Sequence, residues 1–311
     1  MDQLLKDADK IRSLEIQGAT NVALNAIDFL SNYAKRLKQK DLENCIKDLY
    51  KAKDILVSTR PTEPAMKNGL NFIMNRLEKE KHECSVEDLS VMIEGYKDEY
   101  NEKLINSKKK IAEIGARRFP EVGNKFVVMT HCHSTLVTAI LLEAKKQKKN
   151  FKVINTETQP RLQGRKTAEE LVEAGIEVIH VIDSAMRWAV RHFEVDLVLI
   201  GADSITSEGT IINKIGSRLL ALVAHEEHVP FYVASPLLKY NPETNLGILE
   251  NIEIRDPNEV WENSPAGIEI LNPAFETVSR RYIDGLITEA GIFASSHVPN
   301  YFAKLYPEMI E

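Results

Sequence analysis

The sequence predicts an α/β protein in which an N-terminal all-helical domain is followed by a Rossmann-like, mainly parallel sheet with helices on both faces. In the first part of the 311-residue chain, apolar residues recur at helical spacing. In the second part, short apolar runs alternate with amphipathic stretches. We place the boundary after residue 120, so that residues 1–120 form a helical domain and residues 121–311 a Rossmann-like α/β domain, which we expect to be the catalytic one.

The helical domain is predicted from the spacing of its apolar side chains. Ala23, Ile27 and Leu30 recur at intervals that place them on one face of a helix. Residues 86–118 carry many charges and predict one extended helix that links the two domains. Cys45 and Cys84 have no partners in the sequence, and we expect both to be structural.

The second domain contains six apolar runs with the length and composition of strands. Because helical stretches separate most of them, the strands are predicted to be mainly parallel, and ligands of such sheets bind beyond the carboxyl ends of the strands. No GxGxxG or Walker motif is present, so this topology does not imply a dinucleotide. The predicted strands cover residues 126–129, 151–155, 177–182, 197–200, 231–234 and 285–288, and the predicted helices 135–145, 166–174 and 214–224.

Composition excludes several classes of partner. The net charge of −6 argues against nucleic acid and membrane surfaces, which usually require a basic face. The N-terminus has no signal-peptide pattern and no run approaches the roughly 20 apolar residues that span a bilayer, so we expect a cytoplasmic protein. The three cysteines are widely spaced, which favours neither a disulfide framework nor a zinc site, and we expect no bound metal.

Reactive residues follow two of the predicted strands. Cys132 lies between the first strand and the helix after it, where backbone N–H groups and the helix dipole favour a thiolate or a bound anion. Asp203 follows the fourth strand. Arg161 and Lys214 are suited to phosphate, and Asn213 can bond a hydroxyl or Asp203. These positions are predicted to converge on one cleft that offers a thiol and an acid.

Each of these residues also has a structural interpretation. A lone cysteine after a strand is more often a small core residue than a nucleophile, and an aspartate there often caps the next helix. Arg161 and Lys214 are typical of solvated surface charges. The coincidence of polar residues at several strand ends favours the functional interpretation, although it does not name a reaction.

Four motifs occur at these strand ends in order. They read Thr-His-Cys-His-Ser at 130–134, Thr-Glu-Thr-Gln-Pro-Arg-Leu-Gln-Gly at 156–164, Gly-Ala-Asp-Ser-Ile at 201–205 and Ile-Asn-Lys-Ile-Gly at 212–216. Together they resemble the family of translation initiation factor 2B regulatory subunits and sugar-phosphate isomerases, and within it the archaeal enzymes that act on ribose 1,5-bisphosphate. The likeness covers nearly the whole chain.

The resemblance implies an aldose–ketose isomerase that converts ribose 1,5-bisphosphate to ribulose 1,5-bisphosphate in AMP and nucleoside salvage, without a cofactor. Cys132 matches the proton acceptor of the family and Asp203 the proton donor. Moving a hydrogen from C2 to C1 requires one group to take a proton and another to serve the neighbouring oxygen. The positions that match substrate-binding residues are Gln17, Gly18, Ala19, Thr20, Arg60, Ser134, Asn213, Lys214 and Lys239.

The resemblance also implies the partners of the protein. The substrate is a phosphorylated pentose, whose phosphates Arg60, Lys214 and Lys239 would neutralise. Because Gly18 and Arg60 come from the helical domain, we expect the cleft between the domains. The family forms homo-oligomers, either dimers or trimers of dimers (homohexamers), and AMP is a candidate activator. We expect the apolar stripe at 219–223 to be core rather than interface.

Two departures from the family pattern keep alternatives open. Gln17 and Gln159 stand where the isomerases usually have arginine, and losing a guanidinium from a phosphate contact costs about 1.5–3 kcal/mol. One alternative is therefore a non-catalytic, initiation factor 2B-like regulatory subunit, in which Gln159 is typical. Another is a methylthioribose 1-phosphate isomerase, whose monophosphate substrate would explain a missing arginine. The retained Cys132 and Asp203 favour an enzyme.

Overall fold

The computed structural model describes residues 1–16, 18–37, 41–61, 63–83, 85–121, 123–247 and 252–309. The chain forms two compact units. The first comprises Met1–Asn106, Leu238–Tyr240 and Asn300–Glu311, and the second comprises Ser107–Leu237 and Asn241–Pro299. The chain first passes from one unit to the other within a long helix, after Asn106. The domain boundary after residue 120 stays a prediction.

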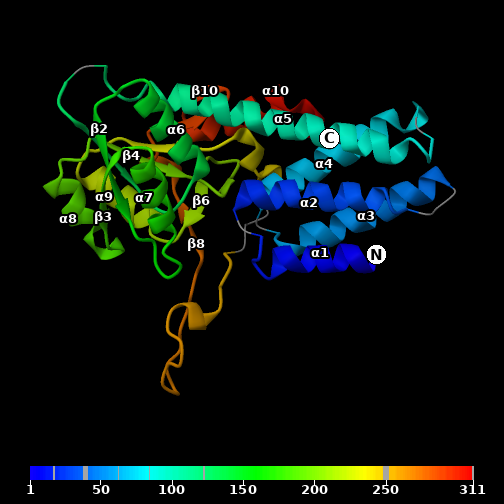
Figure 1. Cartoon of the computed structure of the whole chain (residues 1–311), viewed down its shortest axis with the longest axis horizontal. Coiled ribbons are helices and arrows are strands. Elements are labelled where there is room, and N and C mark those ends of the chain that lie inside the picture. Colours follow the sequence, from blue (N-terminus) through cyan, green and yellow to red (C-terminus); the bar gives the residue numbers. More distant parts are fainter. Residues whose placement is uncertain are drawn as a thin grey trace. The chain divides into compact units, whose positions relative to one another are not determined.

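The first unit is helical, as its apolar spacing predicts. Asp41 caps one helix by accepting a hydrogen bond from the N–H of Asn44, and Pro64 begins the next, where its missing N–H costs nothing. The interior includes Tyr100, whose hydroxyl donates to the carbonyl of Ala65. The helices of this unit are α1 (Asp2–Arg12), α2 (Ala19–Ala34), α3 (Leu42–Thr59), α4 (Pro64–Glu80) and most of α5 (Leu89–Ala116) (Figure 1). The last part of α5 belongs to the second unit. The C-terminal helix α10 (Val298–Leu305) begins in the second unit and ends in the first.

The second unit contains a seven-stranded sheet in the order β10-β9-β7-β4-β1-β2-β3. All neighbours are parallel except β10, which pairs antiparallel with β9 at one edge. All six predicted strands and the predicted fold class are confirmed. The strands are β1 (Phe126–Thr130), β2 (Phe151–Thr156), β3 (Glu177–Val181), β4 (Leu197–Gly201), β7 (Phe231–Ala234), β9 (Gly285–Thr288) and β10 (Gly291–Phe293).

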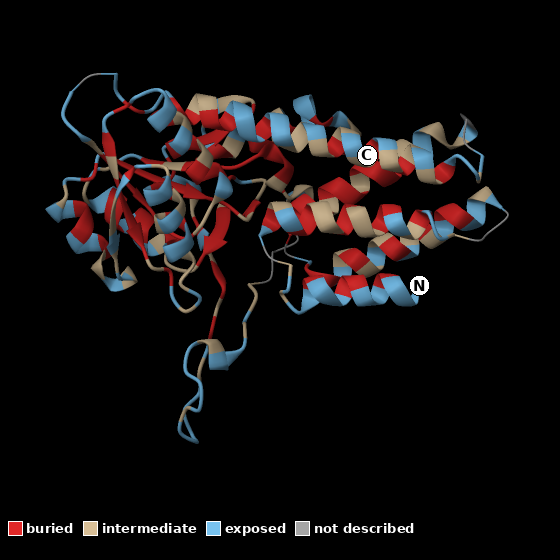
Figure 2. Ribbon diagram, viewed as in Figure 1, coloured by how far each residue is buried: buried red, intermediate tan, exposed pale blue. Residues whose placement is uncertain are grey.

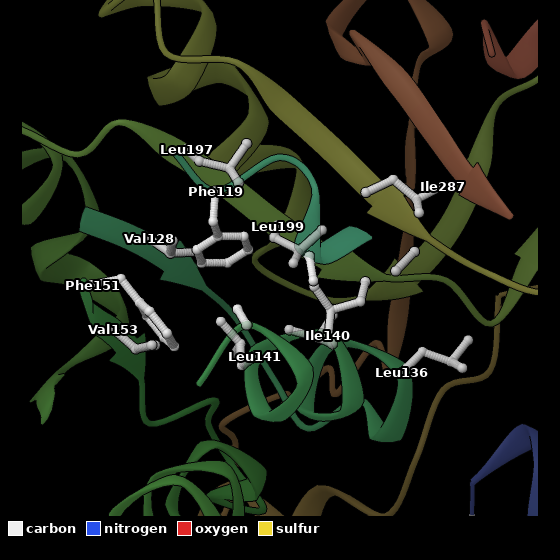
Figure 3. Close-up of a cluster of buried hydrophobic side chains, with 14 of the residues drawn as sticks. Phe119, Val128, Leu136, Ile140, Leu141, Phe151, Val153, Leu197, Leu199 and Ile287 are labelled. Atoms are coloured by element: carbon white, nitrogen blue, oxygen red, sulfur yellow. The ribbon is translucent and has the colours of Figure 1, made fainter. Parts of the chain in front are cut away.

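Helices cover both faces of this sheet. The C-terminal part of α5, α6 (Thr135–Lys146) and α7 (Gln163–Glu173) pack on the face that carries Val128 and Leu199. Figure 3 shows Phe119, Ile140 and Phe151 meeting those strands in one apolar cluster, in which the rings of Phe119 and Phe151 lie 5.0 Å apart. The helices α8 (Met186–His192) and α9 (Ser217–Glu226) pack together beside the sheet. This core packs against β1 and β4, whose carboxyl ends lead to Cys132 and Asp203.

A small antiparallel sheet lies in the same unit and was not predicted. It pairs β5 (Ser204–Ile205), β6 (Ile211–Lys214) and β8 (Phe275–Val278) in the order β5-β6-β8. The predicted helix over 214–224 is therefore wrong at its start, because Lys214 ends a strand. Gly216 has a φ of 101°, which ends the extended backbone and lets the helix begin at Ser217.

The apolar stripe at 219–223 is only partly core, contrary to the prediction. Leu220 and Val223 are buried, whereas Leu219 is 48% and Leu222 41% exposed. The reason is the helical period, since neighbouring apolar residues on α9 point to different faces. The segment 252–274, which extends from the second unit, is also largely exposed. It is mostly pale blue in Figure 2, whereas the central strands of the sheet, such as β1 and β4, are largely red.

Short 3-10 helices connect the longer elements. They cover Lys81–Glu83, Asp183–Ala185, Leu237–Lys239, Pro242–Leu246, Pro257–Glu259, Arg280–Tyr282, Ser295–His297 and Pro307–Met309. Among the residues with described positions, no helix combines the length and the apolar character that crossing a membrane requires.

Candidate active site

Cys132 lies in the turn between β1 and α6 with a left-handed φ of 69°, which residues other than glycine rarely adopt. Its N–H donates to Thr158 Oγ1 at 2.9 Å, and its carbonyl accepts a hydrogen bond from Thr167 Oγ1 at 3.0 Å. Thr158 in the β2–α7 connection and Thr167 in α7 thus hold both peptide groups of this residue. These two hydrogen bonds hold the backbone of the turn from which the thiol projects.

Ser134 begins the helix after this turn. Its Oγ accepts a hydrogen bond from the N–H of Val137 at 3.4 Å, so the hydroxyl acts as an N-cap. Gly201, at the end of β4, lies against it, since a Cβ added there would come within 2.6 Å of Ser134 Oγ. The structure therefore brings the exit of β4 close to the exit of β1, as the sequence predicts for neighbouring parallel strands.

The two histidines beside Cys132 have structural partners. His131 Nε2 lies 2.7 Å from the carbonyl of Ile215, which can only accept, so this nitrogen carries the proton and Nδ1 accepts from Thr156 Oγ1 at 2.6 Å. Burial lowers the pKa of both His131 and His133 and keeps the rings neutral. Across the described ranges, no group of three or more His, Cys, Asp or Glu side chains is placed to hold a metal ion.

The electrostatics of Cys132 link it to Asp203. Burial raises the pKa of the thiol to about 11, the nearby cation Lys214 opposes that rise, and the carboxylate of Asp203 adds to it. Asp203 follows β4, and its N–H donates to the carbonyl of Ile212 at 2.8 Å. The thiol and the carboxylate predicted from two strand ends therefore lie within electrostatic reach of each other. At neutral pH the thiol is protonated.

Lys214 is a buried cation at the end of β6. Its side chain lies with Nζ 4.5 Å from the centre of the Phe275 ring, and burial is the main cause of its lowered pKa. It lines a small pocket in the second unit. The other residues of the pocket come from the β2–α7 connection and from the segment that leads into β8; they include Gln159, Arg161, Gln163, Arg255 and Asn272.

Asn213 is buried next to Lys214, and it bonds a hydroxyl, which is one of the two kinds of partner predicted for it. Its Nδ2 donates to Ser217 Oγ at 2.8 Å rather than to Asp203. Ser217 Oγ in turn donates to the carbonyl of Lys214 at 2.6 Å. The amide of Asn213 thus fixes the turn between β6 and α9, which sets the position of the lysine.

The remaining predicted binding residues belong to the first unit. Gly18 has a φ of 85° and caps α2, and Ala19 and Thr20 form its first turn. Arg60 is 6% exposed, and its Nη2 lies 3.0 Å from Glu63 Oε1. Lys239 ends a short 3-10 helix. The flanking carbonyls of Leu238 and Tyr240 each accept a hydrogen bond from Asn68 at 2.8 Å.

One predicted residue, Gln17, lies outside the described residues. The other predicted residues of the site lie near one another within the second unit; they are Cys132, Ser134, Asp203, Asn213 and Lys214. The cleft between domains, and the joining of the first-unit residues to this group, stay predictions.

Sequence reasoning missed several residues of this site. Thr158 and Gln163 lie in the motif at 156–164, whose strand-end position was a usable signal; Cys132 Sγ lies 3.7 Å from Gln163 Oε1. Thr167 lies in the following helix. Arg255 lies more than a hundred residues after Cys132 in an irregular segment, and no pattern in the sequence marks it.

Comparison with known proteins agrees with this architecture. A family model described as the Initiation factor 2 subunit family matches residues 15–295. The chain belongs to that family. Within the Initiation factor 2 subunit family, a Pyrococcus furiosus protein named ribose 1,5-bisphosphate isomerase is 40% identical, over 97% of this chain and 92% of its own. An Archaeoglobus fulgidus protein of the same name is 38% identical, over 94% of this chain and 90% of its own.

Solved structures show the same family fold. A Pyrococcus horikoshii protein described as translation initiation factor eIF-2B has a TM-score of 0.78 at 29% identity, covering 94% of this chain and 98% of its own. The 5-methylthioribose 1-phosphate isomerase of the same organism also has a TM-score of 0.78, at 25% identity, covering 97% of this chain and 88% of its own. The resemblance inferred from the four motifs is confirmed.

Proposed function

We propose that this chain is an aldose–ketose isomerase that converts ribose 1,5-bisphosphate to ribulose 1,5-bisphosphate. One observation carries the proposal: a buried thiol and a carboxylate from two strand ends lie within electrostatic reach, beside the cation Lys214. Relatives that match this chain over nearly its full length are named for that reaction.

In this proposal Cys132 accepts a proton and Asp203 donates one. Burial holds the thiol protonated, and an ionised Asp203 raises its pKa further, whereas Lys214 lowers it. Lys214 thus favours the ionised thiol that can accept a proton, against the effects of burial and of Asp203. That arrangement suits an isomerisation, in which the acid serves a sugar oxygen while the base takes a hydrogen from the neighbouring carbon.

A turnover assay tests the proposal directly. Purified protein is mixed with ribose 1,5-bisphosphate, and the ketose is detected by ¹³C NMR. We expect Cys132→Ser and Asp203→Asn each to lose at least about 100-fold in kcat, the lower range for a proton-transfer residue, while their unfolding transitions stay near the wild-type value. Cys45→Ala, at a buried cysteine of the first unit, is the matched control and keeps its turnover. Absence of ketose in the wild type would overturn the proposal.

A regulatory subunit that binds without turnover is the second candidate. Two observations favour it: the uncharged Gln159 in the pocket, and the thiol pKa of about 11, which opposes base catalysis. A pull-down with initiation factor 2, run beside the turnover assay, separates the two functions. Binding of the factor with no ketose formed would select the regulator.

Methylthioribose 1-phosphate isomerase is the third candidate. A Caldanaerobacter subterraneus protein of that name is 33% identical over 91% of this chain and 85% of its own. The same NMR assay with methylthioribose 1-phosphate tests it. Faster turnover of this monophosphate than of the bisphosphate would select the third candidate over the first.

The proposal includes a homo-oligomer, either a dimer or a homohexamer built as a trimer of dimers. Exposed apolar side chains on α8 and α9 support association; they are Trp188, Leu219 and Leu222. A cytoplasmic location, a place in AMP metabolism and activation by AMP belong to the same proposal and rest on the sequence resemblance. Light scattering during size-exclusion chromatography measures the assembly, and the turnover assay with added AMP measures activation.

A further inference from the structure

Two cations from distant parts of the chain share one aromatic ring in the second unit. Lys214 Nζ lies 4.5 Å and Arg255 Cζ 5.5 Å from the centre of the Phe275 ring. The arginine side chain is only 7% exposed. Both residues line the same pocket, together with Gln159. A surface arginine in a long exposed segment would normally point to solvent, so its burial here requires a reason.

The backbone holds Arg255 in this position. Its N–H donates to the carbonyl of Asn272 at 2.9 Å, and the N–H of Ala274 donates to the carbonyl of Glu253 at 2.9 Å. This short antiparallel contact leads directly into β8, which pairs with β6 and so with Lys214. Although the rest of the segment 252–274 is largely exposed, the guanidinium is anchored to the same small sheet as the lysine.

The charges around the pair point to an anionic ligand. Burial is the main cause of the lowered pKa of Lys214, and the positive charge of Arg255 is the second cause. Arg255 also lowers the pKa of Cys132. Glu253 Oε1 accepts from Arg255 Nε at 2.9 Å, on one side of the guanidinium. Holding two cations together in a poorly solvated site is unfavourable. Asp203 and Glu253 favour the charged form of Lys214 and so offset part of this cost, and a phosphate that bonds both cations would offset more of it. A planar guanidinium next to an ammonium is the combination that binds phosphate oxygens well.

We propose that Arg255 is a substrate-binding residue that holds one phosphate group together with Lys214. The inference rests on the proposed function, because it places a phosphate of the sugar in the pocket beside Cys132. Gln159 lines that pocket without a charge, and Arg255 supplies a guanidinium there in addition to that of Arg161. The chemical class recognised is a phosphate monoester on a small sugar.

The test measures KM for ribose 1,5-bisphosphate and the Kd of inorganic phosphate by isothermal titration. Loss of a charge-assisted pair predicts that Arg255→Gln raises both by about 10-fold or more, with a smaller change in kcat. Arg255→Lys keeps the charge and the Glu253 partner, so its KM lies between those of the wild type and Arg255→Gln. Gln159→Arg in the Arg255→Gln background returns a guanidinium to the pocket and lowers KM again.

Arg187→Gln is the matched control, because Arg187 is an exposed arginine of the same unit that pairs with Glu226. Its KM and its phosphate Kd stay at the wild-type values. Unchanged KM and Kd in Arg255→Gln would overturn the inference, as would a loss of stability in both Arg255 variants with no change in phosphate binding. If the wild type binds phosphate through Arg255 and makes no ketose, the proposed function fails while the inference stands.

Discussion

Replacing Thr158 with valine tests whether the left-handed turn at Cys132 depends on a single hydrogen bond. Thr158 is 1% exposed, and its Oγ1 accepts the N–H of Cys132 at 2.9 Å. Valine keeps the shape and removes the acceptor, which leaves a buried N–H without a partner. An unsatisfied buried donor costs about 1–3 kcal/mol. A left-handed φ costs a residue with a side chain about 1–2 kcal/mol more, so the turn has reason to relax.

Thr158→Ser separates the hydroxyl from the side-chain shape. It keeps the acceptor and loses one buried methyl, about 0.8 kcal/mol. Thr158 itself has a φ of 64°, which is strained for a β-branched residue, so serine also relieves some strain. We therefore expect Thr158→Ser to stay within about 1 kcal/mol of the wild type, whereas Thr158→Val loses about 1–3 kcal/mol.

Urea denaturation followed by circular dichroism gives the free energy of unfolding, with the slope m checked for constancy. Turnover reports on the turn itself: kcat falls in Thr158→Val because the thiol moves, and it is kept in Thr158→Ser. A loss in Thr158→Ser with none in Thr158→Val would show that the methyl packing of Thr158 matters and that its hydrogen bond to Cys132 does not.

Three further predictions concern other parts of the chain. Gly164→Ala places a Cβ 1.7 Å from the carbonyl oxygen of Thr156, so the free energy of unfolding falls by about 3 kcal/mol or more; a loss below about 1 kcal/mol would contradict the geometry. Because the pKa of Cys132 is about 11, we expect the rate of its alkylation by iodoacetamide to rise with pH up to that value. Mass spectrometry measures this rate in a variant whose other cysteines are replaced by alanine. A plateau below pH 9 would contradict the conclusion that burial raises the pKa of the thiol. Lys35, Lys97 and Ser31 hold the pKa of Glu94 at about 2. The stabilisation from this carboxylate is fully present above the unfolded pKa of a glutamate, and it is lost as the pH falls through the folded pKa of about 2. We therefore expect Glu94→Gln to lower the free energy of unfolding by about 1 kcal/mol at pH 7 and to have no effect in strong acid. An equal loss at both pH values would rule out the ion pairs.

The sequence predicted the main sheet well because its central strands, β1, β4, β7 and β9, are largely buried on both faces. Such strands read as continuous apolar runs, and all six predicted runs became strands. The small sheet was missed because β5 and β6 are short and β6 ends in Asn213 and Lys214, which resemble the start of a helix. Only the φ of 101° at Gly216 decides where the strand stops, and a glycine alone does not reveal its backbone angle.

The site was predictable where the chemistry follows a strand end. Cys132 and Asp203 lie at equivalent exits of β1 and β4, which are neighbours in the sheet, so their proximity followed from topology. Arg255 was not predictable, because it reaches the pocket through a contact with residues 272–274 that local patterns do not encode. The raised pKa of the thiol was also missed, since the sequence shows the helix N-terminus and not the degree of burial.

The small antiparallel sheet places Asp203 and Lys214 through one part of the chain and Arg255 through another. Asp203 directly precedes β5, and Lys214 ends β6, so both depend on the short hairpin that these strands form. Arg255 comes from the long segment between β7 and β8. This segment is bonded to the hairpin near its start, where the N–H of Asn241 donates to the carbonyl of Ile205, and its last residues lead into β8, which pairs with β6. The part of this segment between those two contacts can therefore change in length and composition while Asp203 keeps its position relative to Cys132. Grafting this part from one relative onto another is a practical way to exchange preference for sugar phosphates without rebuilding the reaction centre.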